Sequence, residues 1–91
     1  MAATAGYGVV PIEQVRPMDG LALFQAIKEG RLPAPPISQA LGMTLDEVEL
    51  GRVVFGYRPV FDHYNPLGTV HGGIAATLLD SVMGCCIHTT L

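Results

Sequence analysis

The residues best suited to chemistry lie in a loop and in the apolar segment that follows it. The chain runs through Asn65-Pro66-Leu67-Gly68-Thr69-Val70 into His71-Gly72-Gly73. Glycines at the start of a helix leave backbone N–H groups free at the positive end of the helix dipole, and they let a ligand approach closely. Such a site suits an oxyanion or a polarised carbonyl. The alternative is that Gly72 and Gly73 only permit a tight turn.

Asp80 is the one charged residue beyond residue 62, and it lies within an apolar segment. An unpaired buried carboxylate is costly, so a role as nucleophile or general base is one explanation. The other is a structural carboxylate bonded to Thr77 or to a backbone group. Small residues surround it at helical spacing and would let a second helix or a slender ligand come close; these are Gly73, Ala76, Thr77 and Gly84.

The spacing of these candidates limits how they can act together. Eight residues separate Gly72 from Asp80, which is about 12 Å along a helix. One carbonyl cannot touch both groups of the same helix. If both act on one substrate, two helices must supply them. An antiparallel pair across a two-fold axis would give two equivalent sites per dimer.

The composition excludes several classes of function. A net charge of −3 without a basic stripe argues against nucleic acid, whose binding depends on Lys and Arg. Cys85 and Cys86 are adjacent, which excludes a disulfide framework and predicts reduced thiols in the cytoplasm. No signal peptide is recognised. A membrane span over 72–91 is disfavoured by Asp80 and by the lack of flanking Lys or Arg, so we expect no membrane partner.

We expect no metal and no cofactor. The histidines and cysteines show no metal-binding spacing such as CxxC or HExxH. The cysteines are expected to be core residues, and His71 is expected to orient the loop. A His-Gly-Gly sequence also occurs in the oxyanion loops of lipase-type hydrolases, but the chain has no GxSxG nucleophile elbow.

The order of the predicted elements indicates an α+β class. Asp19 is expected to cap a helix from about Gly20, and Gly51 to supply the turn of a hairpin. The predicted organisation is an irregular arm over 1–18, a short helix over 20–29, a proline-rich connector over 31–36, a helical turn over 37–41, a strand hairpin over about 43–60, a loop over 61–71 and a helix over about 72–89.

The long helix predicted over 72–89 needs more cover than the hairpin can provide. A helix of about 17 residues is roughly 25 Å long and about 10 Å across. Two strands about 4.8 Å apart cover only one side of it. Its apolar residues occupy the whole circumference, which is typical of a buried helix. We therefore expect further strands, a partner subunit or both to cover the remaining faces.

The pattern Asn65-Pro66-Leu67-Gly68-Thr69-Val70-His71-Gly72-Gly73, followed by Leu79-Asp80, resembles hotdog-fold acyl-CoA thioesterases of the phenylacetate-pathway (PaaI-like) branch. The leader over 30–37 also resembles members of that branch, so the resemblance covers about residues 19–91. It implies a hotdog fold, in which a curved antiparallel sheet wraps a long central helix, and homodimers that often pair into tetramers.

The resemblance also implies roles for individual residues. The Gly72 N–H would polarise the carbonyl of an acyl- or aryl-acyl-CoA thioester. Asp80 of the other subunit would attack it or activate water, and Asn65 would help to place the nucleophile or water. Substrate-binding roles are expected for His71, Gly73 and Thr77. We also keep open a non-catalytic hotdog module that binds a ligand or partner without turnover.

Family members continue with about three or four more strands after the helix, whereas this chain stops at Leu91. We therefore expect the chain to be the N-terminal portion of a hotdog domain, apparently truncated after the central helix, or a shortened protein completed by another chain. The acyl preference does not follow from the sequence, because the pocket walls would come largely from absent residues.

Overall fold

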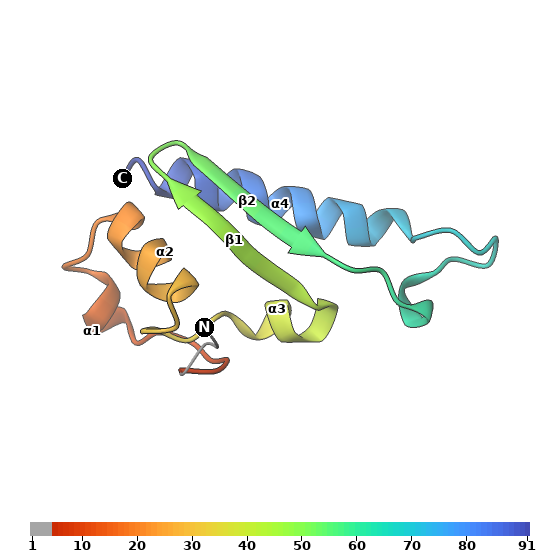
Figure 1. The fold of residues 1–91 in the computed structure, drawn as a ribbon, viewed down its shortest axis with the longest axis horizontal. Helices are drawn as coiled ribbons and strands as arrows, with labels where there is room; N and C mark the ends of the chain where they lie inside the picture. The colour runs from red at the N-terminus through yellow and green to blue at the C-terminus, as the bar shows by residue number, and fades with distance from the viewer. Residues whose placement is uncertain (1–4) are drawn as a thin grey trace.

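The computed structural model describes residues 5–91, which form an elongated α+β molecule of about 46 × 25 × 23 Å (Figure 1). A two-stranded antiparallel hairpin lies against a long C-terminal helix. The elements in chain order are α1 (Ile12–Val15), α2 (Gly20–Lys28), α3 (Pro36–Leu41), β1 (Met43–Glu49), β2 (Arg52–Tyr57), the 3₁₀ turn η1 (Phe61–His63) and α4 (Gly72–His88).

The hairpin turns at Gly51, whose φ of 71° lies in the left-handed region that the sequence led us to expect there. The register shifts between Leu45 and Glu47, so Asp46 is the extra residue of a β-bulge. The bulge explains why Met43 and Val48, an odd number of positions apart, are both buried. Gly56 pairs with Thr44 beside the bulge, and a Cβ atom at Gly56 would lie 2.5 Å from Oδ2 of Asp46.

The strands end earlier than the sequence analysis predicted. β2 stops at Tyr57, whereas the hairpin was expected to reach Val60. Pro59 has no N–H to donate and restricts the residue before it, which ends strand pairing. Within the arm over 1–18, which was expected to be irregular, Ile12–Val15 form one helical turn. Residues 1–4 of that arm lie outside the described part of the chain.

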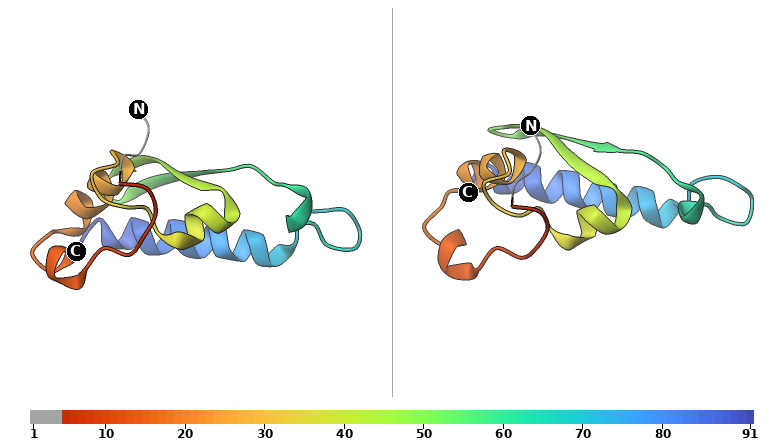
Figure 2. Two further views of the ribbon diagram at one scale, coloured as in Figure 1. Left: turned by 90° about the horizontal axis from the view of Figure 1, so that it is seen from below. Right: turned by 60° about the horizontal axis from the view of Figure 1, so that its bottom comes forward.

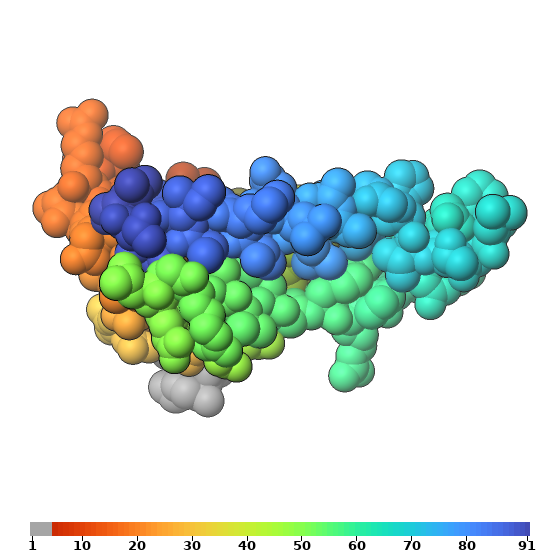
Figure 3. Space-filling model, turned by 90° about the horizontal axis from the view of Figure 1, so that it is seen from above, coloured from red at the N-terminus to blue at the C-terminus, as the bar shows by residue number. Residues whose placement is uncertain are grey.

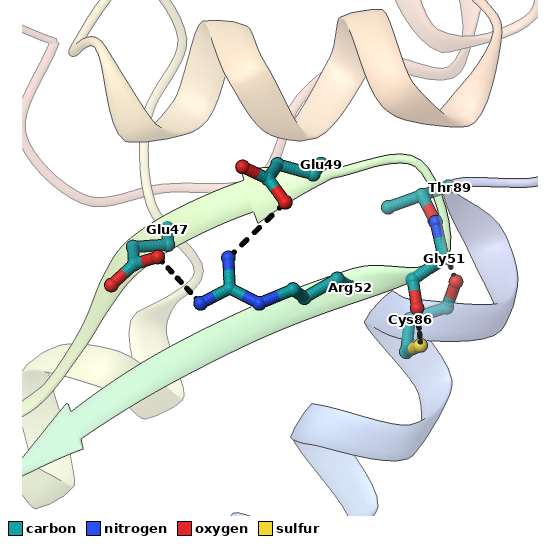
Figure 4. A network of polar contacts seen from close by, with 6 residues as sticks. All are labelled: Glu47, Glu49, Gly51, Arg52, Cys86 and Thr89. Atoms are coloured by element: carbon teal, nitrogen blue, oxygen red, sulfur yellow. Dashed lines mark hydrogen bonds and ion pairs between the residues drawn. The ribbon is translucent and has the colours of Figure 1, made fainter.

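The hairpin turn is tied to the C-terminal end of α4 (Figure 4). The Gly51 N–H donates to Oγ1 of Thr89 at 2.8 Å, and the Cys86 thiol donates to the Gly51 carbonyl at 3.1 Å. Thr89 is only 2% exposed. Nearby, Arg52 forms ion pairs with Glu47 and Glu49, and the hydrogen bond and charge of Glu47 raise the pKa of Arg52. These pairs add little stability, because all three side chains are about half exposed or more.

Helix α2 packs against the same end of α4. The Asp19 side chain accepts a hydrogen bond from the Ala22 N–H at 2.7 Å and caps α2 as predicted. The Gly20 N–H donates to the Leu91 carbonyl at 3.0 Å. Phe24 meets the His88 ring edge to face, with centroids 5.5 Å apart. The C-terminal end of α4 is therefore anchored by both the hairpin and α2.

Gly20→Ala is expected to destabilise the fold, because a Cβ atom at this buried position would lie 1.7 Å from the His88 carbonyl oxygen. Overpacking against backbone costs about 1–3 kcal/mol, which for a chain of this size lowers the thermal midpoint by roughly 10 °C. Thermal unfolding followed by circular dichroism measures this. Gly84→Ala is the matched control, because no atom lies within 4 Å of its added Cβ. Equal midpoints for the two variants would contradict the packing described.

One face of α4 is not covered by the described residues. Figure 2 shows the hairpin on one side of the helix, and Figure 3 shows α4 open to the viewer along its length. Leu79 is 58% exposed, Met83 57% and Ile87 64%. Four apolar residues are buried within 5–91, namely Leu23, Ala26, Met43 and Val48. As expected from the sequence, the hairpin covers only one side of this helix, and no other described residues cover the face that carries Leu79, Met83 and Ile87.

Candidate functional site

The loop between β2 and α4 is organised around Asn65. Its side-chain oxygen accepts hydrogen bonds from the N–H groups of Leu67 and Thr69, at 2.9 and 3.2 Å. Its side-chain nitrogen donates to Oγ1 of Thr69 at 2.8 Å. An antiparallel bridge between Tyr64 and Val70 closes the loop. Most of the hydrogen-bonding capacity of Asn65 is therefore used to shape this loop, and one side-chain N–H remains for another partner.

Three of the predicted residues form a connected set in the first turns of α4. His71 is the N-cap residue, and its Nδ1 accepts a hydrogen bond from the Gly73 N–H at 2.8 Å. Because Nδ1 is the acceptor, the proton of this ring is on Nε2. The Thr77 hydroxyl donates to the Gly73 carbonyl at 2.9 Å. His71, Gly73 and Thr77 thus bind one another, and the His71 cap supports the expected role of this residue in orienting the loop.

Gly72 is the first residue of α4, and it is exposed. Its N–H has no hydrogen-bond acceptor among residues 5–91, since the cap formed by His71 binds the next N–H along. No heavy atom lies within 4 Å of the position that a Cβ atom would take at Gly72. A free N–H at the positive end of a 17-residue helix, with open space before it, can donate to an oxyanion or a carbonyl oxygen.

Asp80 lies on the uncovered face of α4, where it is exposed. Its carboxylate has no hydrogen bond or ion pair within the described residues, and Thr77 binds the Gly73 carbonyl instead of this carboxylate. Within the described residues, Asp80 is therefore bonded neither to Thr77 nor to a backbone group. Gly72 and Asp80 belong to one unbroken helix, so about 12 Å of axial rise separates them.

Tyr57 and His63 hold the loop against the end of the hairpin, a function that sequence analysis missed. The Tyr57 hydroxyl is hydrogen-bonded to Nδ1 of His63 at 2.5 Å, and their rings are stacked. The His63 carbonyl accepts from the His71 N–H at 2.9 Å. Through these two hydrogen bonds, His63 links the end of β2 to the N-cap residue of α4. A tyrosine and a histidine six positions apart in a loop carry no recognisable spacing signal.

The cysteines take no part in this cluster. Burial, and secondarily the negative charge of Asp80, raises the pKa of the Cys85 thiol, so it stays protonated at neutral pH. In the described part of the chain, no three His, Cys, Asp or Glu side chains are grouped so that they could hold a metal ion. Among the same residues, no helix is long and apolar enough to cross a membrane.

Comparisons of the chain with protein-family models, with curated proteins and with solved structures give no match. The class that can be stated for the molecule is α+β, with a two-stranded antiparallel sheet against a C-terminal helix.

Proposed function

We propose that this chain belongs to a hotdog-fold acyl-CoA thioesterase that hydrolyses an acyl- or aryl-acyl-CoA to the free acid and CoA. The observation that carries the proposal is the N-terminus of α4. Gly72 presents an N–H without an acceptor, on a helix whose open face also carries Asp80 without a hydrogen-bonding partner. Hydrolysis of a thioester needs a donor for the carbonyl oxygen and a nucleophile or general base, and a carboxylate can serve as the second group.

In the proposed reaction the Gly72 N–H donates to the thioester carbonyl oxygen and stabilises the charge that develops there. The helix dipole strengthens this interaction. The Asp80 carboxylate either attacks the carbonyl carbon or takes a proton from the attacking water. In either route the C–S bond breaks and the thiolate of CoA leaves. Where water attacks, the acid forms directly; where Asp80 attacks, an acyl-enzyme anhydride forms first, and water then hydrolyses it to release the acid and restore the carboxylate. Asn65 keeps the loop in shape and has one side-chain N–H for water or substrate.

The two groups come from different subunits in this proposal. The separation of about 12 Å along α4 prevents one thioester from meeting the Gly72 N–H and the Asp80 carboxylate of the same helix. An antiparallel pair of α4 helices in a homodimer, or in a dimer of dimers, brings Gly72 of one subunit close to Asp80 of the other. The uncovered face supports this arrangement, because Leu79, Met83 and Ile87 on it would be buried by a partner subunit or by further strands.

The experiment that tests the function is hydrolysis of a panel of CoA thioesters, with acetyl-, octanoyl- and phenylacetyl-CoA as the first three substrates. CoA release is followed chromatographically, because thiol reagents would also label Cys85 and Cys86. Turnover that rises with enzyme concentration supports the proposal. Binding of the thioesters without release of CoA would favour the non-catalytic module instead.

Substitution at Gly72 separates a chemical role from a turn-only role. The open space around this position means that alanine and then valine can be added without a clash within the chain. If the N–H binds the carbonyl, kcat/KM should decrease from Gly to Ala to Val, with a loss of at least about tenfold for Gly72→Val. The thermal midpoint and the oligomeric state should be retained. Loss of the oligomer together with activity would favour the turn-only role.

A further inference from the structure

A second feature of the molecule is a cavity of about 280 Å³ that none of the proposed thioesterase residues lines. It lies between α2, α3, the hairpin and α4. The residue of α4 that lines it is Cys85. Cys85 is thirteen residues after Gly72, which places it about 20 Å further along the helix. Most of its wall is apolar and comes from Phe24, Ile27, Met43, Leu45, Phe55 and Cys85.

The N-terminal arm forms part of this cavity and is held in place by backbone hydrogen bonds. The Gly8 N–H donates to the Ala34 carbonyl at 2.8 Å, and the Ala34 N–H donates to the Gly6 carbonyl at 3.0 Å. Tyr7 and Ala34 form a parallel bridge, and Gly6, Tyr7 and Ala34 all line the cavity. The proline connector and the arm therefore make a wall of regular backbone structure.

Two polar groups of the cavity have no partner within residues 5–91. Ser38 is only 5% exposed as a residue, and its hydroxyl forms no hydrogen bond there, but the hydroxyl oxygen itself stays accessible to solvent. The Ser38 hydroxyl is therefore free to donate to a bound ligand. Lys28 is the one charged residue among the described residues that line the cavity, and it forms no ion pair with them. Because the raised pKa of Cys85 keeps its thiol neutral, no negative charge in the cavity wall balances the positive charge of Lys28.

We propose that this cavity binds a small apolar carboxylic acid. The apolar wall would take a ring or short chain, the Lys28 ammonium would pair with the carboxylate, and the Ser38 hydroxyl would donate to it. A cavity of roughly 150 Å³ can hold benzene, so the volume here suits one ring with a short side chain. The proposal does not depend on thioesterase activity, because the site and its residues are separate.

The test is titration of the chain with 4-phenylbutanoate, followed by amide NMR and by calorimetry. We expect the largest shifts at cavity residues such as Ser38, Phe55 and Cys85, and none at Gly72. Lys28→Gln should weaken binding by about threefold and Ser38→Ala by about tenfold. Arg58→Gln is the matched control, since it removes an exposed cation that does not line the cavity. It should leave the affinity unchanged.

An uncharged analogue, 4-phenylbutan-1-ol, isolates the contribution of the charge. It should bind more weakly than the acid to the parent chain, and Lys28→Gln should not weaken its binding further. Leu45→Trp, which adds volume to the wall, should abolish binding of both compounds. Shifts centred on α4 near Gly72, or affinities for the acid that Lys28→Gln and Ser38→Ala leave unchanged, would overturn the proposal. These readouts use surface or conservative variants and remain decisive even if Leu45→Trp does not fold.

Discussion

Replacement of Asp80 by asparagine should lower kcat for thioester hydrolysis by on the order of 10²-fold or more. Asparagine keeps the size of the side chain but can neither attack a carbonyl as a carboxylate nor accept a proton from water. The exposed Asp80 side chain makes no hydrogen bond or ion pair within residues 5–91, so folding should be nearly unchanged. Steady-state kinetics and thermal unfolding of the same preparation measure both effects.

Asp62→Asn is the control for this substitution. Asp62 is also exposed and lies in η1, close in sequence to the loop, but the proposal gives it no chemical role. Removal of the Asp62 carboxylate should leave kcat within about twofold of the parent value, because surface substitutions usually have small effects. Hydrolysis by Asp80→Asn at near the parent rate would refute the assignment of Asp80 as the catalytic carboxylate.

Mixing two inactive variants should restore activity if the site is shared between subunits. Asp80→Asn removes the carboxylate, and Asn65→Ala removes the three hydrogen bonds that shape the loop. Each homodimer should be nearly inactive. When the two chains are unfolded together in equal amounts and refolded, about half of the dimers are mixed. Each mixed dimer has one doubly damaged site and one intact site, so about a quarter of the parent activity should return.

The opposite result has a clear meaning. If Asp80 and Asn65 acted within one subunit, every site in every dimer would carry one lesion. The mixture would then be no more active than its two components. The mixed sample should be compared with each variant refolded alone, and all three should show the same dimer content by sedimentation. Equal dimer content without recovered activity would exclude the cross-subunit site.

Local features of this fold were predictable because they depend on a few neighbouring residues. Asp19 caps α2, and Gly51 adopts a positive φ where the sequence predicted a hairpin turn. The start of α4 at Gly72 also follows from local glycines and from the His71 cap. The spacing argument for Gly72 and Asp80 could be made from the sequence alone, since helix rise depends only on residue number. The roles of these two residues stay a prediction.

The sequence by itself therefore determined the α+β class and the order of α2, α3, the hairpin and α4, because short-range propensities decide helices and turns. Only the tertiary structure decided which surfaces meet. It placed a bulge at Asp46 and used the Asn65 amide within its own loop. It also joined Tyr57 to His63 and formed the cavity beside Ser38. These contacts link residues whose positions depend on packing between elements, for which sequence spacing carries no direct signal.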